Sequence, residues 1–230
     1  MDATFATFLQ GMMSDPILLI TVILTLSVIF VNGWTDAPNA IATCITTRCM
    51  GVRSAILMSA VFNFLGVLVM THINSSVAST ISNMVDFGGN AHEALIALCA
   101  ALFSIVVYSV GASYFGIPTS ESHSLIAGLS GAAIAIQDGI GGINMGEWAK
   151  VLYGLALSLA LGFISGWAVC KLVSVICRKM DRQKTNPFFK GAQIFGAAAM
   201  SFMHGAQDGQ KFIGVLFLGM AFANGQDSVA

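Results

Sequence analysis

The sequence predicts an all-α polytopic membrane protein, and two observations support this fold class. Only 9% of the 230 residues are charged and 56% are apolar, whereas about a quarter of the residues are charged in an ordinary soluble domain. Uncharged windows of 17 to 32 residues also recur along the chain. A helix of about 20 apolar residues crosses the hydrocarbon core of a bilayer. A membrane β-barrel would require short alternating strands, and this sequence has no such alternation.

The apolar windows predict the membrane helices in order. The predicted segments are residues 17–34, 53–72, 94–115, 119–137, 150–177 and 190–206, and a last apolar stretch covers residues 212–223. Within lipid, the backbone satisfies its hydrogen bonds inside each segment, which favours helices. The first segment is predicted to be a retained helix and not a signal peptide, because no Lys or Arg precedes it.

The few basic residues predict the orientation of the chain. Arg48 and Arg53 flank one connection, and six Lys or Arg residues lie between positions 171 and 190. Cytoplasmic loops collect Lys and Arg. The spans alternate consistently when the N-terminus is outside and residues 178–190 are cytoplasmic, although the inside turn at 116–119 has no basic residue. We therefore expect a multi-pass protein of the cell membrane. The net charge of −1 shows no excess of basic residues, which nucleic-acid binding would require.

The first of three polar clusters covers residues 32–39. A continuous helix over residues 16–47 would be about 48 Å long, too long for one ordinary span, so a break is expected at Gly33 and Pro38. Broken helices in secondary transporters coordinate ions and anions near the middle of the membrane. The alternative is a helix end at the membrane surface. The polar side chains on one side of any helical part are Asn32, Asp36 and Asn39.

The second cluster, residues 201–211, repeats this pattern 172 residues later, so that Asp208 corresponds to Asp36 and His204 to Asn32. In the predicted orientation, the spans that lead to the two clusters run in opposite directions across the membrane. This arrangement is typical of an inverted-repeat secondary transporter with discontinuous helices, in which the substrate and ion sites lie between the halves.

The third cluster, residues 116–124, has the pattern of a helix start. Pro118 is followed by Thr119, Ser120 and Ser122, and Pro before hydroxyl residues is a start signal. Free backbone amides and hydroxyl donors at a helix N-terminus suit a tetrahedral anion such as phosphate or sulfate. The alternative is an ordinary cap with solvated hydroxyl groups.

Together, the clusters resemble the motifs of the inorganic phosphate transporter (PiT) family. Residues 33–40 are similar to its Gly-x-x-Asp-x-x-Asn-Ala motif, residues 204–211 to the version in the second half, and residues 117–123 to the Pro and Ser/Thr run of the first half. The resemblance covers the whole chain. It implies symport of inorganic phosphate into the cell with sodium or protons, no enzymatic activity and no cofactor other than the coupling ion.

The resemblance also implies roles for single residues. Asp36 and Asp208 would hold the sodium ion or the proton, which offsets the charge of phosphate in a site of low dielectric constant. Glu121 interrupts a run that is usually uncharged, and we hypothesise that it takes part in proton or cation coupling. The residues implied to bind phosphate are Asn32, Asn39, Thr119, Ser120, Ser122, Gln207 and Lys211.

The expected organisation has three parts. Residues 1–177 form the first transmembrane repeat, residues 178–190 a basic cytoplasmic connection, and residues 191–230 the start of a second repeat. No counterpart of residues 118–123 follows Asp208, so an N-terminal portion of a transporter is expected, with a natural short form completed by another chain as the alternative. The expected partners are phosphate, sodium or protons and the lipid bilayer. The sequence leaves the coupling ion and the oligomeric state, including a homodimer, open.

Three other functions are open to the same sequence. The same fold could carry sulfate or another oxyanion, because hydroxyl groups do not distinguish tetrahedral anions. A membrane hydrolase using Ser122, His123 and Asp36 is disfavoured, because adjacent Ser and His side chains do not face each other on a helix. A scaffold without transport is disfavoured by the number of polar groups within apolar segments.

Overall fold

The computed structural model describes residues 11–74, 76–88 and 90–224. Over these residues the chain is helical, with one isolated bridge between Val85 and Ile143. The α-helices are α2 (Pro16–Thr35), α3 (Ala37–Thr46), α4 (Val52–Ile73), α5 (Ser76–Asn83), α6 (Ala91–Tyr114), α7 (Glu121–Ile136), α8 (Met145–Ile176) and α9 (Arg182–Ala223). Short 3-10 turns cover Ile140–Gly142 and Cys177–Lys179. The predicted all-α polytopic fold class is confirmed.

Four stretches of the described chain are long and apolar enough to cross a membrane. They are Pro16–Thr46, Val52–Ile73, Ala91–Tyr114 and Met145–Lys179. These stretches confirm the segments predicted at residues 17–34, 53–72, 94–115 and 150–177. The first stretch extends past the predicted segment because it includes α3.

The segment predicted at residues 119–137 and the part of the chain after residue 190 differ from the structure. The segment predicted at residues 119–137 is α7, a helix of 16 residues, which is shorter than the roughly 20 residues that a straight span requires. The end predicted for the segment at 190–206 is wrong, because α9 runs without interruption for 42 residues and includes the apolar stretch at 212–223. The glycines of the second polar cluster therefore do not break the helix.

Close packing between α4 and α9 explains why the glycines of this cluster are there. A side-chain carbon added at Gly205 would collide with the backbone of Asn63, and one added at Gly209 would collide with Val67. Across the same contact, a carbon at Gly66 would collide with the carbonyl group of Phe202. Small residues let two membrane helices approach this closely. The glycines thus bring the polar residues of α9 against α4.

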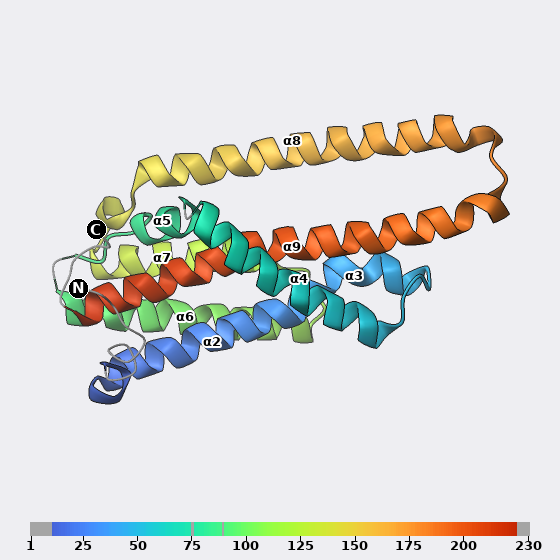
Figure 1. The fold of residues 1–230 in the computed structure, drawn as a ribbon. Coiled ribbons are helices and arrows are strands. Elements are labelled where there is room, and N and C mark those ends of the chain that lie inside the picture. The colour runs from blue at the N-terminus through green and yellow to red at the C-terminus, as the bar shows by residue number, and fades with distance from the viewer. Residues whose placement is uncertain (1–10, 75, 89, 225–230) are drawn as a thin grey trace.

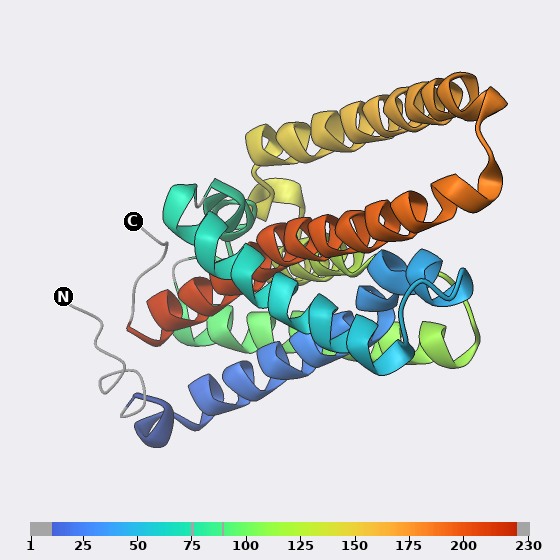
Figure 2. The same ribbon diagram turned by 45° about the vertical axis from the view of Figure 1, so that its right-hand side comes forward.

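Helix α9 is the central element of the bundle. Helices α2, α3, α4, α5 and α6 all contact it, and α7 packs on α6 (Figures 1 and 2). The buried core is apolar and includes Val28 of α2, Leu98 and Leu102 of α6, Leu129 of α7 and Val215 of α9. This packing holds the polar residues in the middle of α9 near the ends of α2 and α7.

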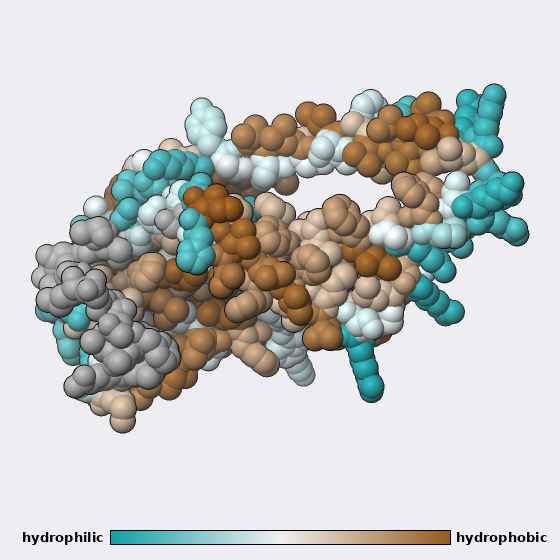
Figure 3. All heavy atoms as spheres, viewed as in Figure 1, coloured by the Kyte–Doolittle hydropathy of each residue, from teal (hydrophilic) through white to brown (hydrophobic). Residues whose placement is uncertain are grey.

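Helix α8 lies apart from the other helices (Figure 1). None of its 32 residues is buried, although a hydrogen bond of 3.2 Å from the Trp148 indole to the Ser130 hydroxyl joins its start to α7. Apolar side chains cover much of its visible surface (Figure 3). A helix that is apolar all round is suited to a membrane environment.

The two basic connections lie at the same end of the bundle. The turn between α3 and α4 contains Arg48, and the turn between α8 and α9 contains Arg178 and Lys179; both turns are on the right in Figure 1. Hydrophilic residues gather at this end in Figure 3. This arrangement agrees with the predicted common side for the two loops, and their cytoplasmic location stays a prediction.

Candidate functional site

The first polar cluster surrounds a break between two helices. Helix α2 ends at Thr35 and α3 begins at Ala37, with Asp36 between them. The Asp36 N–H still donates to the Asn32 carbonyl at 2.9 Å, and the Asn39 N–H donates to the Asp36 carbonyl at 3.0 Å. Pro38 lies in the first turn of α3, where its missing N–H is tolerated. The predicted interruption between Gly33 and Pro38 is therefore present, centred on Asp36.

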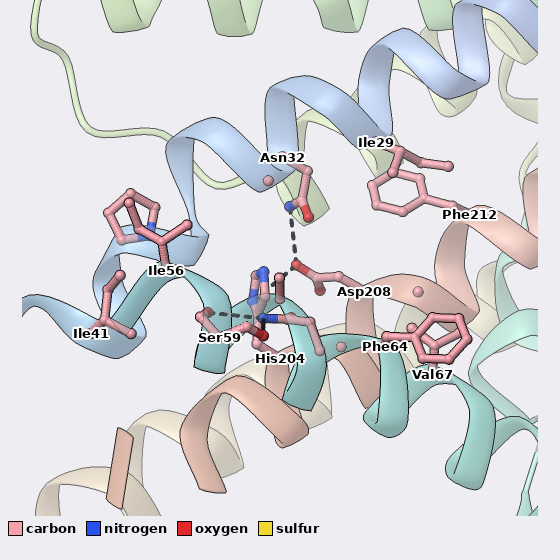
Figure 4. A pocket seen from close by; sticks show the side chains of 16 residues that line it. Ile29, Asn32, Ile41, Ile56, Ser59, Phe64, Val67, His204, Asp208 and Phe212 are labelled. Atoms are coloured by element: carbon pink, nitrogen blue, oxygen red, sulfur yellow. Dashed lines mark hydrogen bonds and ion pairs between the residues drawn. The ribbon is translucent and has the colours of Figure 1, made fainter. Parts of the chain in front are cut away.

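Asn32 connects the two acidic residues that the sequence pattern relates to each other. Its amide nitrogen Nδ2 donates to Asp36 Oδ2 at 3.2 Å and to Asp208 Oδ2 at 3.1 Å. Asn32 and Asp208 are 6% and 8% exposed. Figure 4 shows Asn32 of α2 and Asp208 of α9 pointing toward each other. The first and second clusters thus meet in space, because Asn32 bonds to both Asp36 and Asp208.

Lys211 joins the second cluster to the third. Its ammonium group donates to Asp208 Oδ1 at 2.6 Å and to the Ser122 hydroxyl at 2.5 Å. One turn earlier on α9, His204 Nδ1 lies 3.5 Å from Asp208 Oδ2. The sequence predicted no role for His204, although its correspondence with Asn32 could have identified it as a site residue. Asp208 is therefore contacted by groups from α2 and from both neighbouring turns of α9.

Ser120 and Glu121 form the start of α7. Ser120 is the N-cap, since its hydroxyl accepts the His123 N–H at 3.5 Å. The sequence alone does not distinguish Thr119 from Ser120 as the capping residue. Glu121 is 2% exposed, and its two carboxylate oxygens have no hydrogen-bond partner among the described residues. The backbone N–H of Glu121 faces the Asp36 carboxylate. The positive end of α7 therefore points toward an anionic group.

Two cavities lie at these residues. One, of about 450 Å³, lies between α2, α3, α4 and α9 (Figure 4) and is lined mostly by apolar groups together with Asn32, Asp208 and His204. The other, of about 580 Å³, lies beside the start of α7 and is lined by Thr119 and Ser120 among other residues. The carboxylate of Asp208 and the hydroxyl groups of residues 119 and 120 thus line different cavities.

Two residues of the predicted set lie outside these contacts. Asn39 and Gln207 are both exposed, and their side chains make no hydrogen bond with the described residues. Gln210, which the sequence interpretation left out, is 2% exposed and donates to the Asn74 carbonyl at 2.7 Å. That bond joins α9 to the residue that follows α4.

Most of the chain, including all three polar clusters, matches a known family. A family profile described as "Phosphate transporter family" matches residues 32–229. The chain belongs to this family. The members are transporters and not enzymes, and the several apolar helices agree with a multi-pass protein of the cell membrane.

Individual relatives are longer than this chain. A probable low-affinity inorganic phosphate transporter of Bacillus subtilis is 32% identical over 213 residues, which cover 91% of this chain and 62% of the relative. A low-affinity inorganic phosphate transporter of Escherichia coli is 33% identical over 215 residues, which cover 82% of this chain and 42% of the relative. The chain thus spans between two fifths and two thirds of the length of these two relatives.

A solved structure has the same fold. The protein described as "The sodium-dependent phosphate transporter" superposes with a TM-score of 0.73 at 20% identity, over 91% of this chain and 68% of that chain. At this identity the likeness establishes the arrangement of the helices alone. It supports the helix order described above, including the stretch from α2 to α9.

Proposed function

We propose that the complete protein carries inorganic phosphate into the cell by symport with a cation, either sodium or protons. The observation that carries this proposal is the meeting of three distant polar clusters at Asp208. Asn32 reaches Asp208 from α2, and Lys211 connects Asp208 to Ser122 of α7. Polar groups within apolar membrane helices cost stability, so their presence indicates a function.

The start of α7 is the proposed phosphate site. Thr119, Ser120 and Ser122 supply hydroxyl groups there, and a helix N-terminus adds free amides and the positive end of the helix dipole. Lys211 supplies a positive charge next to Ser122. Asn32, Asn39 and Gln207 complete the proposed set. The exposure of Asn39 and Gln207 leaves both available to the substrate.

Asp36 and Asp208 are the proposed cation ligands. Their carboxylates lie on either side of the Asn32 amide, and carboxylate oxygens are hard ligands that suit sodium. Phosphate would be repelled from a region with three acidic residues and one Lys, namely Asp36, Glu121, Asp208 and Lys211. A bound cation removes part of that repulsion, which gives a physical reason for coupling.

The relatives support a second half in the complete protein. The chain covers 62% and 42% of the two relatives described above, and the similarity between residues 32–39 and 204–211 supports an inverted repeat. In this proposal residues 1–177 are the first repeat, residues 178–190 the cytoplasmic connection and residues 191–230 the start of the second repeat.

Uptake of labelled phosphate tests the proposal. The full reading frame is expressed in cells that lack other phosphate carriers, and sodium and the proton gradient are removed in turn. We expect uptake that depends on one of the two cations and that excess sulfate does not abolish. Absence of uptake would overturn the proposal, and uptake abolished by sulfate would favour the alternative oxyanion carrier.

A further inference from the structure

Two thiol groups lie close together because of the way in which α3 ends. The Cys49 N–H donates to the Cys44 carbonyl at 2.9 Å, and the Arg48 N–H donates to the Ile45 carbonyl at 3.0 Å. Arg48 has a positive φ of 56°. These features define a Schellman motif, in which the residue after the left-handed one commonly packs against the residue five positions earlier. Cys49 and Cys44 occupy these two positions.

Both thiols also contact the same residue of α9. Cys44 Sγ donates to the backbone carbonyl of Gln193 at 3.2 Å, and Cys49 Sγ donates to the side-chain Oε1 of Gln193 at 3.3 Å. The Thr47 hydroxyl lies 3.0 Å from Cys49 Sγ and 2.7 Å from the same Oε1. The two sulfur atoms are therefore held against one residue, and their hydrogen bonds join the turn between α3 and α4 to α9.

The two thiols differ in their access to solvent. Cys44 is 0% exposed, whereas Cys49 is half-buried. An accessible thiol beside a second, resolving thiol is the arrangement of many redox-sensing cysteines. The turn also lies at the end of the bundle predicted to be cytoplasmic, where thiols are normally kept reduced. A disulfide at this turn would therefore be a modification made under oxidising conditions and not a permanent crosslink.

We propose that Cys44 and Cys49 are a site of oxidation by hydrogen peroxide, which joins them in a disulfide across the end of α3. The Cys49 thiolate attacks one peroxide oxygen, the O–O bond breaks, and a sulfenic acid and water form. The Cys44 thiolate then attacks the sulfenic sulfur, the S–O bond breaks, and the leaving hydroxide takes up a proton. In balance, two thiols and one hydrogen peroxide give one disulfide and two water molecules.

The disulfide changes how the turn is attached to α9. Both thiol hydrogens are consumed, so the donated bonds from Cys44 and Cys49 to Gln193 are lost. The contact between Thr47 and Gln193 Oε1 needs no thiol and is retained. The pair lies at the opposite end of α3 from Asp36, so this inference does not rest on the proposed phosphate transport.

Trypsin digestion tests the inference, because Arg48, the first basic residue of the chain, lies between the two cysteines. The purified full-length protein is treated with hydrogen peroxide, its remaining thiols are alkylated, and it is digested without reductant. We expect the peptide of residues 49–53 to stay attached to the fragment that ends at Arg48 and to be released by a reductant. In the untreated protein we expect the same peptide to be free and alkylated at Cys49.

Two variants complete the test. Cys44→Ser is expected to abolish the linked product and to leave Cys49 as a sulfenic acid, which a dimedone-type reagent captures. Cys170→Ser is the matched control, since Cys170 is an exposed thiol on α8, and it is expected to give the linked product as the wild type does. A free, alkylated peptide 49–53 after a peroxide treatment that oxidises Cys170, or its linkage to Cys170 or Cys177, overturns the inference. The wild-type digest decides even if Cys44→Ser does not fold.

Discussion

The side-chain amide of Asn32 donates to the carboxylate of Asp208 at 3.1 Å, across 176 residues of sequence. Both residues are buried, and both line the cavity between α2, α3, α4 and α9. The amide also donates to Asp36 at 3.2 Å. A single neutral group therefore lies between two acids, and its removal leaves both facing each other without a donor between them.

Replacement of Asn32 is expected to reduce transport. Asn32→Leu keeps the approximate volume and removes both donated hydrogen bonds, which leaves two carboxylates without this donor at a cost of about 1–3 kcal/mol each. We expect phosphate uptake to fall roughly tenfold or more. Ser27→Ala is the control, because Ser27 is half-buried on α2 and its hydroxyl donates within the helix to the Ile23 carbonyl. Normal uptake by Asn32→Leu would contradict the proposed role.

Lys211 is expected to be sensitive to the length and geometry of its side chain as well as to its charge. Lys211→Met removes the ammonium group that donates to Asp208 at 2.6 Å, and uptake is expected to be lost. Lys211→Arg keeps the charge but places a larger planar group between Asp208 and Ser122, so we expect partial uptake with a raised KM for phosphate. Lys150→Met serves as a control, because Lys150 is exposed and paired with Glu147 at 2.6 Å. Equal activity of both Lys211 variants would rule out a role for its charge.

The contact between α4 and α9 is expected to be intolerant of added volume. Gly205→Ala places a carbon against the backbone of Asn63, where no flexible side chain can move away. A cost of about 1–3 kcal/mol in folding free energy is expected, measured as a lower thermal midpoint of the purified protein. Gly196→Ala, on the same helix, meets nothing within 4 Å and is expected to be neutral or slightly stabilising. Similar midpoints for the two variants would contradict the close packing.

Substitutions of Ser120 are expected to separate its capping role from its proposed substrate role. Ser120→Ala loses the N-cap of α7 at a cost of about 1 kcal/mol. Ser120→Asp keeps a good N-cap but adds a negative charge at the proposed phosphate site. We therefore expect Ser120→Asp to match the wild type in thermal stability and to lose phosphate uptake. Uptake by Ser120→Asp at the wild-type rate would place phosphate elsewhere.

The sequence predicted those parts of the fold that depend on local hydrophobicity. The spans of α2, α4, α6 and α8 follow from uncharged windows, and the break at Asp36 follows from Gly33 and Pro38. The continuity of α9 could not be predicted in this way. Gly205 and Gly209 have the same local pattern as a helix break, and only their contact with α4 shows that they are packing residues.

Only part of the candidate site could be predicted, because the rest depends on contacts between helices. The motif pattern brought together Asn32, Asp36 and Asp208, and their hydrogen bonds agree with it. The pairing of Lys211 with Ser122 and the isolation of Glu121 depend on how α7 is placed against α9. Periodicity within one helix carries no information about such a placement. Asn39 and Gln207 are examples, because both belong to the predicted set and yet lie exposed.

The close contact of α4 and α9 restricts how the protein can move. Backbone meets backbone at Gly66 and Gly205, so the two helices cannot slide past each other without first separating, and tightly packed interfaces do not deform gradually. We expect these helices to move as one rigid body. A change of conformation would then fall on the polar links that α9 makes to other helices, from Asp208 to Asn32 and from Lys211 to Ser122. The side chains proposed to bind phosphate and the cation are then also the contacts that break when the helices move apart.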